Sequence, residues 1–267
     1  MQVRQPDFDF TGIDPVWADD PVAVHGINAQ GLVPAYIEPF LIKVMRRAKA
    51  ELDPVRHADL LADLDVFNKQ EAQHFKFHVA LNRWIREGGY PGMAEIERRY
   101  EAEYEAMLAE RPLDWLLAYC EGFESMGLAA SHGWVDGATS AGLAGADPRP
   151  IALWEWHLAE EYEHRTVAFR VLKALYGRNP IRFYRLRLSG LLHAARHIGA
   201  NVGALQSYLV RTHRELAGGE APPPPPKAGR GSQLGLLRRF VPVLSPFYDP
   251  ARVPPPARLG TVLGRTA

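Results

Sequence analysis

Two Glu-x-x-His pairs are the feature that most constrains how this chain folds. They are Glu71–His74 and Glu161–His164, each within a long segment of helical character. Residues three apart on an α-helix project from one face, so each pair directs a carboxylate and an imidazole toward one place. Apolar residues accompany both pairs, so the pairs are expected to be buried. Carboxylates and imidazoles are costly to bury unless they are paired, hydrogen-bonded or bound to metal. The pairs therefore predict helices that meet around a shared polar core.

The predicted fold class is all-α, because no segment shows the alternation typical of strands. Proline at helix starts and glycine at helix ends divide the chain into segments. Helices are predicted from about Pro34 to Glu51, from Pro54 to Gly88, over 94–110, from near Pro112 to a loop at 136–149, after that loop, and from Asn179 to about Leu216.

Three regions are expected. Residues 1–29 form an irregular N-terminal arm, and 30–217 a helical bundle with a dinuclear metal site. Residues 218–267 hold a Pro-rich linker, "GGEAPPPPPKAGRGS", and a C-terminal arm. Proline-rich segments favour an extended conformation. We therefore expect the residues after about 218 to pack as an arm, on this chain or on a neighbouring copy, and a homodimer stays open.

Composition narrows the function classes. The 31 basic and 31 acidic residues cancel, so no overall charge favours nucleic acid. The single cysteine, Cys120, excludes an internal disulfide and fits a reducing compartment. The chain begins without a basic and apolar leader, and no run approaches the roughly 18 apolar residues of a membrane span. We expect a soluble, cytoplasmic protein.

A further glutamate precedes each pair on an earlier predicted helix. Glu38 lies between apolar residues in "AYIEPFL", and Glu121 lies in "AYCEGFES". The order Glu, Glu-x-x-His, Glu, Glu-x-x-His is the ligand arrangement of ferritin-like dinuclear carboxylate bundles. Oxygen and nitrogen donors without thiolates suit two iron ions, with manganese or zinc as alternatives. The competing interpretation is a hydrogen-bonded network in the core with no metal.

Several neighbours of these residues have open roles. Glu124 competes with Glu121 for the third helix, and Glu121 is favoured because Glu124 is expected to lie further round the helix. His78 is expected to pack or to hydrogen-bond behind the site, and Cys120 to be a small core residue beside it. The remaining candidates are Glu160 and Glu163, expected to be solvated or to lie behind the ligands, and Asp65 and Asn68, which could orient ligands by hydrogen bonds.

Four stretches of the sequence resemble those of a bacterial family called predicted metal-dependent hydrolases, which belongs to the ferritin-like group. They are "DPVWADDPVAVHGINAQGLVPAYIEPFL", "DLDVFNKQEAQHFKFHVALN", "AYCEGFES" and "EWHLAEEYEHRTVAF", and the tail "LLRRFVPVLSPFYDPARVPPP" is similar as well. The resemblance implies a ferritin-like four-helix bundle with extra helices and a Pro-rich C-terminal arm.

The last helix of the set carries a third histidine. His157 lies about 40° from Glu161 and about 20° from His164 around the helix axis. The spacing His157-x-x-x-Glu161-x-x-His164 is similar to the fourth helix of the dinuclear arylamine N-oxygenases, which add a histidine to the usual six ligands. This resemblance implies that His157 is a seventh ligand; the alternative is a histidine hydrogen-bonded behind the site.

The leading functional prediction is a non-haem dinuclear iron oxidase or oxygenase that uses O₂, a small-molecule substrate and an electron donor. Glu38, Glu71 and His74 would serve one metal, and the other predicted ligands would serve the second, with Glu71 and Glu161 bridging. The alternative is a dinuclear metal-dependent hydrolase, although no G-x-S-x-G or Walker-type loop accompanies it.

The stretch 178–214 contains many arginines and no acidic residue, which raises a third prediction. It could lie on anionic lipid or bind a partner. The favoured interpretation is a bundle helix that pairs with the acidic helix predicted at 95–110.

Overall fold

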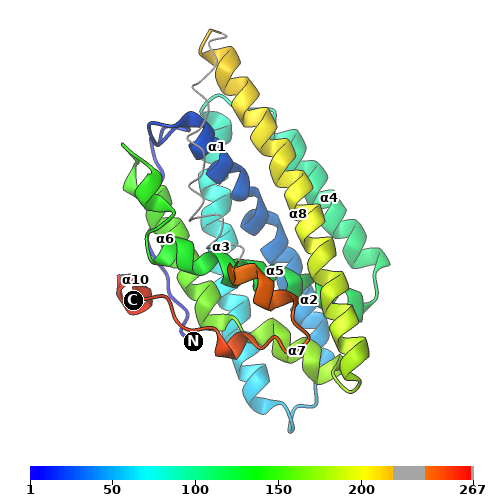
Figure 1. Ribbon diagram of the computed structural model, residues 1–267. Helices are drawn as coiled ribbons and strands as arrows, with labels where there is room; N and C mark the ends of the chain where they lie inside the picture. The colour runs from blue at the N-terminus through cyan, green and yellow to red at the C-terminus, as the bar shows by residue number, and fades with distance from the viewer. Residues whose placement is uncertain (219–237, 266–267) are drawn as a thin grey trace.

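The computed structural model describes residues 1–218 and 238–265, and this part of the chain is all-α without strands, as predicted (Figure 1). The α-helices are α1 (Pro21–Gln30), α2 (Leu32–Glu51), α3 (Ala58–Glu87), α4 (Met93–Glu110), α5 (Leu113–Val135), α6 (Pro148–His164), α7 (Val167–Tyr176), α8 (Pro180–Leu216) and α10 (Leu259–Gly264). Short 3₁₀ turns occur at Ser140–Gly142, Val241–Leu244 and Pro250–Arg252.

Three helices begin with the same local signal, an Asp or Asn followed by Pro. Asp20, Asp147 and Asn179 cap α1, α6 and α8 by accepting hydrogen bonds from backbone N–H groups of the first turn. These N–H groups have no partner within the helix, and proline already has the dihedral angle of the first helical position. This signal explains why α8 begins where the sequence predicted it.

Two predicted boundaries are wrong. Residues 1–29 were expected to be irregular, but α1 occupies Pro21–Gln30, because Asp20 caps it and its apolar side packs against α8. The second predicted helix starts at Ala58 rather than at Pro54. Asp53 instead accepts hydrogen bonds from the N–H groups of Val55 and Arg56, which makes a turn.

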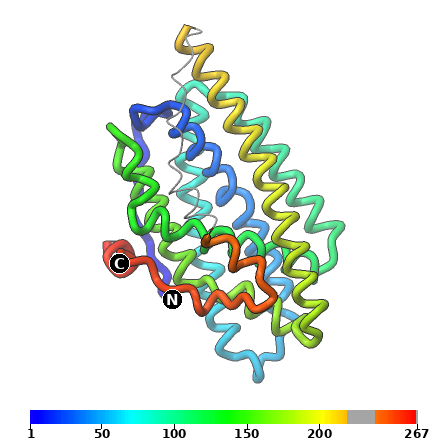
Figure 2. Tube along the Cα trace, viewed as in Figure 1, coloured from blue at the N-terminus to red at the C-terminus, as the bar shows by residue number. Residues whose placement is uncertain are grey.

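Four helices, α2, α3, α5 and α6, surround the polar core. α2 packs along α3 and α5 packs along α6, while α2 also contacts α5 and α3 contacts α6 (Figure 2). Side chains between them form one large apolar cluster. The predicted pairs lie within this cluster on α3 and α6, so their polar atoms are enclosed by apolar packing.

The long helix α8 crosses α5 at very short range. A Cβ on Gly190 would lie 2.1 Å from the carbonyl oxygen of Ala118, and one on Gly122 would lie 2.6 Å from the Cα of Leu191. Only glycine permits this backbone approach. The two glycines therefore bring side chains of α8 close to the inner face of α5.

α8 also pairs with the acidic helix α4. Glu103 on α4 lies 2.9 Å from Nε2 of His197 and accepts a 3.0 Å hydrogen bond from Asn201 on α8. This is the packing that the sequence favoured for the arginine-rich stretch.

The C-terminal segment packs on this chain. Tyr162 donates to the carbonyl of Val253 at 2.8 Å, and Tyr184 donates to that of Leu244 at 3.1 Å. The polyproline linker expected from 218 onward lies outside the described residues, apart from Gly218. Among the helices that are described, none has the length and apolar character needed to cross a membrane.

Candidate metal centre

Seven buried side chains from α2, α3, α5 and α6 form two overlapping groups. The first, here called the Glu38 group, is Glu38, His74, His157 and Glu161; the second, the Glu124 group, is Glu71, Glu124, Glu161 and His164. In each group, one donor atom from every residue lies within 4.8 Å of the others. None of the seven is more than 3% exposed. Glu161 belongs to both groups.

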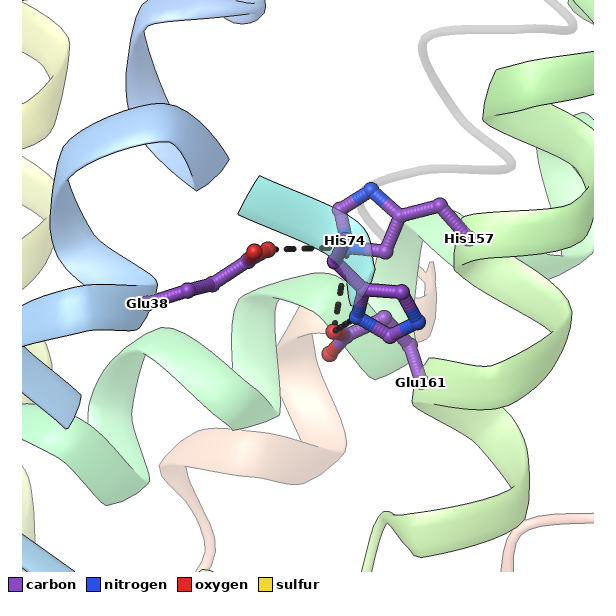
Figure 3. A group of neighbouring side chains, drawn as sticks. All are labelled: Glu38, His74, His157 and Glu161. Carbon is purple, nitrogen blue, oxygen red and sulfur yellow. Dashed lines mark hydrogen bonds and ion pairs between the residues drawn. The ribbon is translucent and has the colours of Figure 1, made fainter. Parts of the chain in front are cut away.

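Glu161 lies between three histidines. Its Oε1 is 3.1 Å from Nε2 of His157, 3.4 Å from Nε2 of His164 and 3.8 Å from Nδ1 of His74. His157 and His164 flank it on α6 at positions i−4 and i+3, which lie on the same helix face. Figure 3 shows this arrangement for the Glu38 group, with Glu38 of α2 facing His157 of α6. A local helical spacing thus sets the middle of the centre.

Glu71 connects the two groups in a second way. Its Oε1 lies 3.2 Å from Nε2 of His164, and its Oε2 lies 3.7 Å from Nδ1 of His74. The two oxygens of one carboxylate therefore face different groups, which is the placement expected for a bridging carboxylate.

The structure places Glu124, not Glu121, in the centre. Glu124 Oε2 lies 3.5 Å from Nε2 of His164. Glu121 instead accepts hydrogen bonds from Arg187 on α8 at 2.9 Å and from Ser125 at 3.0 Å. The expectation for Glu121 is corrected because the close crossing of α8 supplies a buried cation that takes this carboxylate.

His157 lies on the side opposite to the one expected. It was expected to join Glu161 and His164 at the second metal, but its Nε2 lies 3.2 Å from Oε1 of Glu38. Its ring centroid is 4.3 Å from that of His74. The spacing along α6 determines only the helix face on which His157 lies. The packing of α6 on α2 and α3 determines which group His157 joins.

Several carboxylate oxygens and imidazole nitrogens that could bind metal lack hydrogen-bond partners. Both oxygens of Glu38, Glu71 and Glu124 are buried and form no hydrogen bond, and the same holds for Nδ1 of His74 and Nε2 of His164. In the described part of the chain, none of the four carboxylates pairs with Arg or Lys. Buried polar groups are almost always satisfied, so these atoms fit a bound cation.

The carboxylates of the centre differ in the direction in which their pKa values are shifted. Burial, together with the neighbouring carboxylates, raises the pKa of Glu38 and of Glu124 well above the ordinary range. Burial also opposes ionisation of Glu161, but His164 and His157 outweigh it and hold the pKa of Glu161 below its usual value. Two divalent cations would neutralise the carboxylates of Glu38, Glu71, Glu124 and Glu161.

Each histidine is oriented by a partner on its outer nitrogen. His74 Nε2 lies 3.0 Å from Oε2 of Glu160, and His157 Nδ1 lies 2.9 Å from Nε2 of His78. His164 Nδ1 lies 3.2 Å from Oε1 of Gln70. Such contacts leave the other ring nitrogen facing the centre, as in ligating histidines. The expected hydrogen bond of His78 is confirmed, and Glu160 is buried rather than solvated.

The N-terminal segment completes this outer layer. Arg4, 7% exposed, donates to Glu160 at 2.9 Å and to Glu163 at 3.0 Å. Glu163 also accepts a 2.7 Å hydrogen bond from Gln70. The roles of Arg4 and Gln70 were not predicted from the sequence. The adjacency of Gln70 to Glu71 is a local signal for Gln70, whereas nothing near Arg4 in the sequence marks its role.

Asp65 and Asn68, which were expected to orient ligands, form no hydrogen bond with the seven residues. Asp65 pairs with Lys49 at the surface and orients no ligand. Asn68 contacts none of the seven residues through a hydrogen bond, and its Oδ1 is unpartnered. Cys120 is fully buried, as expected of a small core residue.

Sequence comparison adds the family. A family model described as predicted metal-dependent hydrolase matches residues 2–254. The chain belongs to this family. None of the curated proteins or solved structures compared with it matches. The family description and the two groups of side chains both indicate that the protein depends on a metal. Neither identifies which metal it is.

Proposed function

We propose that this protein is an enzyme built on a dinuclear metal centre. Glu38, His74 and His157 would hold one ion, Glu71, Glu124 and His164 would hold the other, and Glu161 would belong to both sites. The observation that carries the proposal is the set of buried donor atoms without hydrogen-bond partners. Leaving so many polar atoms unsatisfied would cost several kcal/mol, on the order of 1–3 kcal/mol per group, without a bound cation.

The reaction we propose is hydrolysis, which the family description supports. Two divalent cations would supply Lewis-acid activation of water and of a substrate oxygen. The protein's own residues bind and orient: Glu160 and His78 fix the ring positions of His74 and His157, and Arg4 neutralises Glu160. Apolar packing around the four helices limits the entry of bulk water.

Metal content and turnover test this proposal together. Protein loaded with manganese, zinc or iron is assayed by mass spectrometry and with a panel of carboxylic and phosphate esters. We expect about two ions per chain in the native protein and fewer in Glu161→Gln. Glu155→Gln on the same helix is the control, because Glu155 pairs with Arg258 and Arg265 rather than with the centre. No stoichiometric metal in the loaded native protein would overturn the proposal.

A second candidate is O₂ activation by two iron ions, with a small-molecule substrate and an electron donor. It is favoured by the enclosure of the centre, since all seven side chains are buried and a gas reaches such a site more easily than an ester does. A third histidine beside Glu-x-x-His pairs is also the pattern shared with the arylamine N-oxygenases, and the ferritin-like order of ligands holds if Glu124 takes the third-helix role.

Oxygen consumption distinguishes the two reactions. Protein loaded anaerobically with ferrous iron is mixed with oxygenated buffer, and the uptake of O₂ per chain is measured. Stoichiometric uptake that Glu161→Gln abolishes would favour the oxidase. Tight iron binding without uptake, together with ester turnover, would favour the hydrolase.

A further inference from the structure

A cavity of about 520 Å³ lies between α5 and the C-terminal segment 238–254, on the outer side of the proposed metal centre. In Figure 1 this segment, in orange, crosses in front of α5. The apolar part of its wall includes Leu128, Ala129, Val243 and Val253. A cavity of this size and character fits a small organic molecule.

The C-terminal segment is fixed on both sides of the cavity. On one side Arg187 of α8 reaches the carbonyl of Val243 at 3.5 Å, and on the other Nε2 of His132 lies 3.0 Å from the carbonyl of Pro254. Arg165 donates to Pro250 at 3.1 Å. These bonds span the segment, so the space beneath it is a built feature of the fold.

Cations at the cavity exceed anions. Arg238 and Arg239 line it and form no ion pair with any described residue. Arg252 also lines it and is partly compensated by Asp249 at 3.5 Å, the carboxylate of the lining. The excess of positive charge favours an anionic group.

One buried donor at the cavity lacks a partner. Tyr248 is 8% exposed and lines the cavity, and its hydroxyl lies beside the side chain of Ser125 without a well-formed hydrogen bond to a described residue. Its ring is held in place by the guanidinium of Arg187, 4.6 Å from the ring centroid. A buried hydroxyl is costly to leave unsatisfied, so it indicates a polar group on the bound molecule.

One turn of α5 separates the cavity from the centre. Ser125 lines the cavity and donates to Glu121, while the adjacent Glu124 belongs to the Glu124 group. Gly127 faces the centre, since a Cβ there would lie 2.7 Å from Oε2 of Glu161. Neighbouring faces of α5 therefore serve the cavity and the centre.

We propose that this cavity binds an amphipathic anion. Its apolar body packs against Leu128, Val243 and Val253, its carboxylate or phosphate lies at Arg238 and Arg239, and the Tyr248 hydroxyl donates a hydrogen bond to it. The proposal goes beyond the reaction at the metal centre and does not depend on metal.

Calorimetric titration of the full chain with dodecanoate and with dodecyl phosphate tests the proposal, in the presence and absence of metal. We expect saturable binding of at least one of the two at about one molecule per chain, and much weaker binding of dodecan-1-ol, which lacks the charge. Preference for one anion over the other identifies the headgroup. Because metal-free protein is titrated as well, the result is separate from the test of the metal centre.

Variants place the anion in the cavity. Arg238→Gln with Arg239→Gln is expected to weaken binding about tenfold or more, and Tyr248→Phe by a smaller factor. Arg178→Gln, just before α8, with Arg185→Gln on α8 is the matched control and should leave binding unchanged. Absence of saturable binding, equal affinity for dodecan-1-ol, or equal loss in the control pair would overturn the proposal.

Discussion

Replacing Glu121 and Glu124 separately should have opposite consequences, because only Glu124 belongs to the proposed centre. Glu124→Gln removes a carboxylate that faces His164, so we expect loss of about one ion per chain. Glu121→Gln should retain both ions but destabilise the fold, since it leaves the guanidinium of Arg187 without its carboxylate.

The size of the Glu121→Gln effect follows from burial. Glu121 is 1% exposed and Arg187 is 3% exposed, with Nε and Oε1 separated by 2.9 Å. Removing one partner of such a buried pair costs about 3–5 kcal/mol. Arg187 retains its contacts with Tyr248 and the carbonyl of Val243, which favours the lower end. At about 3 kcal/mol, the midpoint of thermal unfolding should therefore fall by roughly 6–12 °C.

A double variant isolates the pair. Glu121→Gln with Arg187→Met removes both charges and should recover much of the stability lost in the single variant. The assay combines thermal unfolding with metal content per chain after identical loading. Loss of an ion in Glu121→Gln, with full metal content in Glu124→Gln, would refute the assignment of Glu124 and the reasoning from Arg187.

Three further predictions concern the surroundings of the centre and the fold. Arg4→Met should lower both metal affinity and thermal stability, because it leaves the buried carboxylate of Glu160 without its cation; equal metal affinity in a competition titration with a chelator would contradict this. Gly190→Ala should lower the unfolding midpoint by forcing α5 and α8 apart, whereas Gly199→Ala, which meets nothing within 4 Å, should stabilise the helix by up to about 1 kcal/mol in denaturant titrations. Burial and the nearby His213 lower the pKa of His25 to about 4. Because the unfolded chain then binds the extra proton, the free energy of unfolding should fall as the pH drops from about 6.5 toward 4, and His25→Gln should reduce that slope.

Local geometry made much of the fold predictable. Helix periodicity and proline and glycine at helix ends are properties of neighbouring residues, so the all-α class and most helix boundaries followed from the sequence. The same holds for the pairs Glu71–His74 and Glu161–His164, whose spacing alone directs both side chains of each pair to one side. The sequence did not anticipate α1, the start of α3, the break between α6 at His164 and α7 at Val167, or the short helix α10.

The composition of the centre depended on contacts between distant segments. Glu121 and Glu124 lie only about 60° apart around α5, so periodicity does not separate them, and Arg187, far along the chain, does. Likewise Arg4 reaches Glu160, and the packing of α6 against α2 brings His157 to Glu38. The sequence by itself determined the helices and the residues that face inward. Tertiary structure decided which of those residues meet, because only the close packing of helices sets distances between side chains that are remote in the chain.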